Sequence, residues 1–437
     1  MMCVEGMRNS TRARVAACCL LAATTFLVIM LMAGPVASLT TASMTTAGTT
    51  RLQLVASGGG EVVPPDGDYL SPAQRAEIEA MLVANIGMLT AAGTLTQPRA
   101  TEQIALDWPL AARDGFTDPG YHAITGFVDH TPDIPNKLTD YACGGRTYSG
   151  HKGTDIFMWP FAWNKMAAGD VTIAAAADGV IVGRRDGNPD QSCNFNSNSW
   201  NAVYVRHADG SIAWYGHMKR GSLTTRGVGS MVSAGEYLGL VGSSGNSTGP
   251  HLHFELHDYQ GQLLDPYIGS CNPLEGGSWW ASQPNYYDSA INKLMTGTGP
   301  VSWKACPLPD DTNEAIQFQP GDRITFSTYY RDQLNTLPSL YRIRGPNGAI
   351  FAQWSQTIKP AHYALSQWWW SYDFPASVMT GTWRFEVEFN GRTYSHTFYV
   401  GEPATPTPTP IPTATATPFP DDYPRNYLPG VMRPSAP

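Results

Sequence analysis

The stretch "GPHLHFELH", residues 249–257, alternates polar and apolar side chains as a half-buried β-strand does. Side chains two residues apart in a strand point to the same side and lie about 6.6 Å apart. His251 and His253 are therefore expected to face one side, while Leu252 and Phe254 face a core. Two imidazoles can thus converge on one site. Strand geometry keeps both histidines as candidate metal ligands and does not rank them.

A third histidine, His257, has the same parity, but it would lie about 13 Å from His253 along a straight strand. That is too far to share a zinc ion whose ligand bonds are roughly 2.1 Å long. A second motif, "HKGTD", contains His151 and Asp155, and Gly153 between them permits a bend that would bring the two side chains together. One carboxylate and two imidazoles form the three-ligand set of a catalytic zinc. Each motif alone is a weak signal.

The composition favours a β-rich protein outside the cell. The chain has 437 residues, with 43 glycines, 34 prolines, 13 tryptophans and 20 tyrosines, and only 15% of its residues are charged. The net charge is -8, and no dense run of lysine or arginine is present, which argues against nucleic acid or an anionic membrane as the partner. Short apolar runs between turn residues indicate an antiparallel β domain over about 108–271.

A second β domain is expected over about 301–400. Its clearest part is "TWRFEVEFNGRTYSHTFYV", in which apolar and charged residues alternate before an Asn390–Gly391 turn. This pattern is typical of a β-sandwich hairpin. In "SQWWWSYDF", Trp368 and Trp370 share one face, either as a platform that stacks on sugars or as part of the sandwich core. We favour the core.

The first 38 residues have the pattern of a signal peptide, and the alternative is an uncleaved anchor helix. We favour the signal peptide, so no stable membrane span is expected after its removal. Removal would leave four cysteines in an oxidising compartment, which predicts two disulfides. Sequence nearness favours the pairs Cys143–Cys193 and Cys271–Cys306. Before the first β domain, a Ser71–Pro72–Gln74 start predicts a helix through about residue 86, either as a docking helix or as a pro-segment.

The order of three motifs is more specific than any of them alone. "HKGTD", then "YGHM" at 215–218, then "SSGNSTGPHLHFEL" resembles the lysostaphin-type (LytM-like) family of zinc metalloendopeptidases. "AAADGVIVG" and "VSAGEYLGLVGSSG" resemble the family's strands around the site, and the likeness covers roughly residues 105–270. It implies an antiparallel β-sheet peptidase domain with a groove. One zinc ion per domain would be held by His151, Asp155 and His253.

The resemblance also carries over His217 and His251 as the catalytic pair. The chain has no H-E-x-x-H motif, so histidine must replace the glutamate base of the enzymes that carry it. We assign the general base to His251 and the oxyanion or proton-donor role to His217, and the order between these two stays open. Gly249 and Pro250 would end a flexible loop at the rim of the groove.

The function implied is that of a secreted zinc metalloendopeptidase. It would be a monomer and would hydrolyse peptide bonds in the cross-links or stems of bacterial peptidoglycan, in a glycine bridge or at a D-amino-acid junction. Two alternatives remain, namely a non-catalytic cell-wall-binding or regulatory module and a secreted protease that acts on glycine-rich proteins. The second β domain, an immunoglobulin-like sandwich, would place or shield the enzyme.

These expectations divide the chain as follows: 1–38 signal peptide; 39–104 solvated spacer with one helix, a possible pro-segment that keeps the enzyme latent; 105–275 lysostaphin-type peptidase domain; 276–300 linker; 301–400 β-sandwich accessory domain; 401–437 Pro/Thr-rich linker and tail.

Overall fold

The computed structural model describes residues 52–63, 70–96 and 103–401. The expected signal peptide, and the expected tail from residue 402, lie outside these ranges. The described chain is mainly β, as the sequence predicts, with strands that pair almost entirely antiparallel. No helix in the described ranges is long and apolar enough to cross a membrane.

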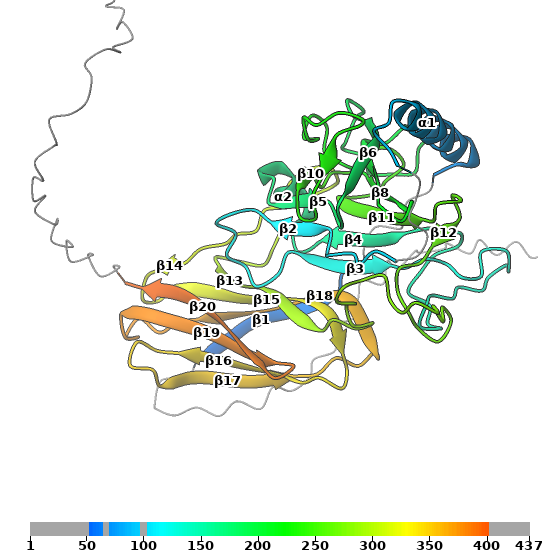
Figure 1. Cartoon of the computed structure of the whole chain (residues 1–437). Helices are drawn as coiled ribbons and strands as arrows, with labels where there is room; N and C mark the ends of the chain where they lie inside the picture. The colour runs from blue at the N-terminus through cyan, green and yellow to red at the C-terminus, as the bar shows by residue number, and fades with distance from the viewer. Residues whose placement is uncertain (1–51, 64–69, 97–102, 402–437) are drawn as a thin grey trace, which may run out of the picture. The chain divides into compact units, whose positions relative to one another are not determined.

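The first domain is built on an eight-stranded antiparallel sheet (Figure 1). Its strands, in order, are β3 (His122–Gly126), β4 (Thr154–Met158), β11 (His251–His257), β8 (Ile212–Gly216), β7 (Ala202–Arg206), β6 (Gly179–Arg185) and β9 (Met231–Val232), with β12 (Leu263–Leu264) beside β11. A three-stranded sheet consists of β10 (Tyr237–Leu240), β5 (Val171–Ala174) and β2 (Leu110–Ala112), and a short helix α2 (Ala162–Ala168) follows β4.

The core of this domain lies on one face of β11. Leu252, Phe254 and Leu256 are at most 1% exposed and belong to one hydrophobic cluster with Val171 and Ile173 of β5. The alternation read from the sequence is therefore confirmed. The residues between these apolar side chains, which include the histidines, lie on the opposite face.

Helix α1 (Pro72–Ala91) packs on that opposite face, beside β6 (Figure 1). It starts with the predicted capping box, in which the Ser71 hydroxyl accepts from Gln74 N–H and the Gln74 side chain accepts from Ser71 N–H. The helix runs about five residues beyond the predicted end, and Leu89 in this extension is also buried. Its apolar residues share a cluster with strands β6, β7 and β8: Ile78, Leu82, Leu89, Val182, Tyr204, Trp214.

The second domain has two sheets that enclose one hydrophobic cluster, the arrangement of a β-sandwich. One sheet consists of β1 (Gln53–Glu61), β18 (His362–Asp373), β15 (Arg323–Leu334) and β13 (Ala290–Gly297). The other consists of β14 (Gln317–Phe318), β20 (Arg392–Val400), β19 (Gly381–Phe389), β16 (Ser339–Arg344) and β17 (Ile350–Gln356). That its topology is immunoglobulin-like stays a prediction.

Two sequence details of the sandwich are confirmed. Asn390 and Gly391 have φ angles of 47° and 71° and connect β19 to β20, as a two-residue hairpin turn requires. Trp370 is 8% exposed in the cluster between the sheets, and Trp368 packs against the same cluster. The reading of these tryptophans as core residues is therefore correct.

Two segments expected to be connections are strands of this sandwich. Strand β1 lies within the expected spacer, yet it pairs antiparallel with β18 from Gln53↔Asp373 to Glu61↔Ser366. Strand β13 lies within the expected linker at 276–300 and pairs with β15. The spacer assignment was wrong for β1 because this strand is mostly exposed and Gly-rich, so it carries no apolar alternation and is held by backbone pairing.

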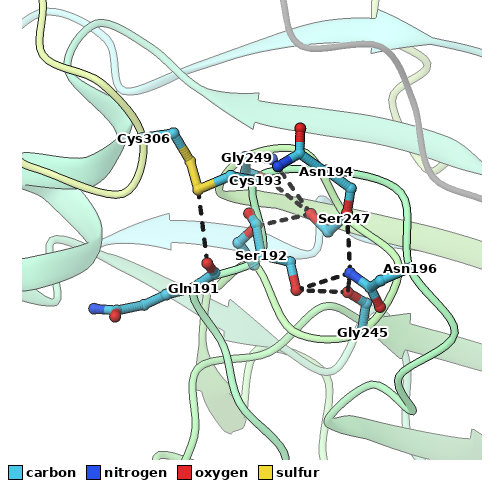
Figure 2. The surroundings of a disulfide bond; sticks show 10 residues. Gln191, Ser192, Cys193, Asn194, Asn196, Gly245, Ser247, Gly249 and Cys306 are labelled. Atoms are coloured by element: carbon cyan, nitrogen blue, oxygen red, sulfur yellow. Dashed lines mark hydrogen bonds between the residues drawn. A yellow bond between two sulfur atoms is a disulfide. The ribbon is translucent and has the colours of Figure 1, made fainter.

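The disulfide pairing predicted from sequence nearness is wrong. Cys143 bonds Cys271, and Cys193 bonds Cys306, with Cα–Cα distances of 5.1 and 5.8 Å. Tertiary contacts set the partners: Cys271 N–H donates to the carbonyl of Tyr141, two residues before Cys143, at 2.8 Å. Figure 2 shows Cys193 between Ser192 and Asn194, on a loop that bonds the segment before β11.

Candidate metal centre

The structure brings three of the predicted site residues together as a group that could hold a metal ion. One ligand atom each of His151, Asp155 and His253 lies within 4.8 Å of the others. Asp155 on β4 is directly opposite His253 on β11 in the sheet register. His151 precedes β4, and the chain bends at Gly153, so that His151 Nε2 lies 3.2 Å from Asp155 Oδ1. The expected bend is therefore present.

Gly153 is also required by the close approach of β11. A Cβ atom at this position would lie 2.6 Å from the His253 ring and 2.8 Å from the backbone oxygen of Phe254. Both atoms belong to the strand that carries the ligand, so neither can move without moving His253. A glycine here allows the chain before β4 to approach β11 at the candidate metal centre.

We expect Gly153→Ala to weaken zinc binding by at least about tenfold, because the added methyl group displaces the His253 ring. Zinc affinity measured by chelator competition on the folded variant checks this. Gly145→Ala is the matched control, since a Cβ there meets no atom within 4 Å. Equal affinities for the two variants would contradict the steric argument.

The polar contacts of His151 and His253 set which ring nitrogen of each faces Asp155. His151 Nδ1 lies 2.6 Å from the carbonyl oxygen of Phe127, which can only accept, so its Nε2 is left to face Asp155. In His253 the arrangement is reversed: Nε2 lies 2.9 Å from Glu255 Oε1, and Nδ1 lies 2.9 Å from Asp155 Oδ1. His151 Nε2, His253 Nδ1 and a carboxylate oxygen of Asp155 thus converge, and two imidazoles with one carboxylate form a donor set that fits zinc.

Tyr148 supports this group and was missed by the sequence analysis. Its hydroxyl donates to Asp155 Oδ2 at 2.8 Å, and its ring stacks on His151 with centroids 4.1 Å apart. The carboxylate is thereby fixed with its other oxygen toward the two histidines. An isolated tyrosine three residues before a histidine carries no recognisable pattern in a single sequence.

The predicted catalytic histidines lie beside the metal-ligand group. The rings of His217 and His251 have centroids 4.5 Å apart, and His251 Nε2 lies 3.6 Å from Asp155 Oδ1. His217 Nδ1 contacts the carbonyl oxygen of Ser244 at 2.6 Å, and His251 Nδ1 contacts that of Gly249 at 2.8 Å. The Nε2 atom of each neutral ring is therefore the one able to accept a proton.

Local backbone geometry places His217 at the end of β8. Its φ of 57° lies in the left-handed region, which is uncommon for a residue other than glycine. The preceding Gly216 allows the Trp200 ring to pack directly on the strand, because a Cβ at Gly216 would lie 2.3 Å from that ring. Trp200 in turn contacts the edge of His217 with centroids 5.2 Å apart. The strand end and the tryptophan together fix the imidazole.

The Ser/Gly-rich loop before β11 is buried, although a flexible loop at the rim was expected. Asn201 N–H donates to Ser244 Oγ at 2.8 Å. Figure 2 shows Ser192, whose Oγ donates to the Gly245 carbonyl at 2.7 Å. Asn196 N–H donates to Asn246 Oδ1 at 2.6 Å. Small residues fit this crowded position, and the loop presents the carbonyl groups that orient the two catalytic candidates.

Glu255 completes the face of β11 that carries the histidines. Its side chain is fully buried and accepts from His253, His257 and Arg75. Burial alone would raise the pKa of Glu255, but the Arg75 guanidinium and the two imidazoles hold this pKa well below its usual range. Glu255 is therefore ionised, and it keeps the Nε2 proton of His253 in place.

His257 stays outside the metal-ligand group, as strand geometry predicts. It stacks on Trp214 with centroids 4.4 Å apart and bonds Glu255. Glu255 itself could have been found, since it shares the parity of the histidines in the strand. Arg75 could not, because it lies 180 residues away.

A cavity of about 450 Å³ is lined by residues 189–196, Asn198 and Arg220. None of the predicted site residues lines it. The five predicted site residues, which are His151, Asp155, His217, His251 and His253, are each no more than 5% exposed. The groove that the resemblance implies over the metal-ligand group stays a prediction.

Residues 149–266 match the family described as peptidase family M23. DD-carboxypeptidase/endopeptidase Mpg of Neisseria meningitidis serogroup B is 41% identical over 96 residues, which are 22% of this chain and 19% of that protein. Peptidoglycan DD-endopeptidase ShyC of Vibrio cholerae is 33% identical over 106 residues, which are 24% of this chain and 20% of that protein. The chain thus spans about one fifth of the length of these curated relatives. The catalytic domain of the M23 protein EnpA from Enterococcus faecalis is 25% identical and covers 35% of this chain and 92% of that structure, with a TM-score of 0.22.

Proposed function

We propose that this chain, which belongs to peptidase family M23 through residues 149–266, is a zinc-dependent endopeptidase. It would hydrolyse peptide bonds in bacterial peptidoglycan. The observation that carries the proposal is the convergence of His151, Asp155 and His253 inside the matched region. The name of ShyC, a peptidoglycan DD-endopeptidase, supports peptidoglycan as the substrate. The "DD" in the names of both relatives favours a D-amino-acid junction over a glycine bridge.

His151 Nε2, Asp155 Oδ1 and His253 Nδ1 would hold the zinc ion, as their hydrogen bonds leave these atoms facing one another. When bound, zinc supplies Lewis acidity to the substrate carbonyl and to the attacking water. Tyr148 and Glu255 hold two of the ligands in place from behind. This division agrees with the general rule that partners of metal ligands fix their orientation.

His251 and His217 would move the protons. Peptide hydrolysis requires one group that takes a proton from water and another that donates to the oxyanion or the leaving amine, and imidazole can do both near neutral pH. His251 Nε2 lies 3.6 Å from Asp155 Oδ1, beside the candidate ligand group, so we assign it the proton from water. His217, held by the Ser244 carbonyl, would present Nε2–H to the tetrahedral oxyanion or the amine when it is protonated.

A location outside the cytoplasm, as a secreted or cell-envelope enzyme, agrees with the two disulfides, because such bonds persist in oxidising compartments. Monomeric behaviour remains our expectation for the whole chain.

The function is tested by incubating the purified chain with peptidoglycan and following new amine ends. We expect release that stops when a chelator removes the metal and returns when zinc is restored. Sequencing of the new ends distinguishes a glycine bridge from a D-amino-acid junction. Cleavage of a glycine-rich protein but not of peptidoglycan would favour the protease alternative, and no cleavage of either would favour a non-catalytic module.

A further inference from the structure

Arg75 of helix α1 contacts Glu255, the residue that bonds His253 on the side away from Asp155. The Arg75 guanidinium forms two hydrogen bonds with Glu255, from Nη1 to Oε2 at 2.9 Å and from Nη2 to Oε1 at 2.6 Å. The Arg75 side chain is 13% exposed, and that of Glu255 is 0% exposed. The guanidinium also lies over the Trp214 ring at 5.9 Å. This contact is therefore a buried, two-pronged ion pair, which is more selective in geometry than an exposed one.

The start of the helix determines where this arginine lies. Arg75 is in the first turn, and its N–H donates to the Ser71 carbonyl at 3.0 Å, which is the first backbone bond of the helix. The Gln74 side chain, beyond its part in the capping box, donates to the Asn198 carbonyl at 2.8 Å. Ile78 then enters the apolar cluster on the sheet. The contacts of Gln74 before it and of Ile78 after it thus fix the position of Arg75 beside Glu255.

Each oxygen of Glu255 receives one N–H from Arg75 and one from a histidine. Oε1 accepts from His253 Nε2 at 2.9 Å, and Oε2 accepts from His257 Nε2 at 2.8 Å. A carboxylate has about four acceptor positions, so all of them are filled. The rigid guanidinium fork sets the plane of the carboxylate. That plane sets the direction of the His253 Nε2–H bond, and with it the direction in which Nδ1 points.

We propose that Arg75 is a positioning residue of the metal centre, which acts through Glu255 on the orientation of His253, so that helix α1 belongs to the working enzyme. The inference rests on the proposed function, since it takes His253 as a metal ligand. It replaces the view of this helix as a removable pro-segment. Removal of the helix would leave the buried Glu255 without its guanidinium, at a large cost for a buried ionised group.

The test is a double-mutant cycle on zinc affinity in the full chain. Competition with a chromogenic chelator is measured for wild type, R75Q, E255Q and the double variant R75Q/E255Q. We expect R75Q and E255Q each to weaken zinc binding by roughly 10- to 100-fold, the range found for partners of metal ligands. The double variant should stay within about twofold of E255Q, because Arg75, as proposed, acts on zinc through Glu255.

Two further variants separate positioning from general stability. E77Q removes the exposed ion pair between Glu77 and Arg185, which joins the same helix to β6, and should leave zinc affinity unchanged. R75K keeps the charge without the fork and should give an intermediate affinity, which also keeps the test open if R75Q folds poorly.

The results that would overturn the proposal are distinct. Zinc affinity of R75Q within about twofold of wild type, full additivity in the double variant, or an equal loss in E77Q would each reject a positioning role for Arg75. If wild type itself binds no zinc, the proposed function fails and the inference fails with it.

Discussion

Replacement of His253 by alanine is expected to remove zinc from the chain and to lower peptidoglycan hydrolysis by at least about 10³-fold. The reason is that His253 Nδ1 is one of only two imidazole nitrogens in the candidate group found in the described residues. Loss of Lewis-acid stabilisation worth several kcal/mol corresponds to this factor, since each 1.4 kcal/mol or so is tenfold in rate. Zinc content after dialysis and the release of amine ends measure the two effects.

The control for this variant is His257→Ala on the same strand and face. His257 bonds Glu255 but lies outside the group of possible ligands. We expect it to retain zinc, with a loss in affinity of less than about tenfold. A loss of zinc from His257→Ala equal to that from His253→Ala would reject the ligand assignment.

Alanine at His251 or at His217 is expected to leave zinc bound while kcat falls by roughly 10²- to 10⁴-fold, the range for positioned acid–base groups. The two imidazoles lie together beside the ligand group without belonging to it. Because they would act in one proton path, the double variant should lose little more than either single variant.

The pH dependence assigns the two roles. A general base must be unprotonated, so activity should fall as the pH falls, and His251→Ala should lose this acidic limb. A proton donor must be protonated, so His217→Ala should lose the alkaline limb. The opposite pattern would exchange the roles, and zinc loss in either variant would show that the residue is a ligand.

The sequence predicted those parts of the fold and site that depend on local pattern. Alternation along "HLHFEL" placed Leu252 and Phe254 in the core and the histidines on the other face. Gly153 indicated the bend that joins His151 to Asp155, and Asn390–Gly391 indicated the hairpin. These features are set by neighbours in the chain, so one sequence contains the information. Family resemblance added the division between ligands and catalytic pair, which local geometry left open.

The features that escaped prediction all join distant segments. Arg75 meets Glu255 across 180 residues, and Cys193 meets Cys306 across 113. Strand β1 is held by backbone pairing with β18, which leaves no side-chain signature. Partners of this kind are chosen by how sheets and loops meet, which neither spacing nor composition records.

The two disulfides interlock along the chain. One closes the loop 143–271 and the other closes the loop 193–306, so the two loops share residues 193–271. A single cut of the backbone anywhere between residues 143 and 306 therefore leaves two fragments that are still covalently joined. His151, Asp155, His217, His251 and His253 all lie in that stretch. As the secreted enzyme proposed above, the chain would stay in one piece after a single nick within its expected peptidase domain.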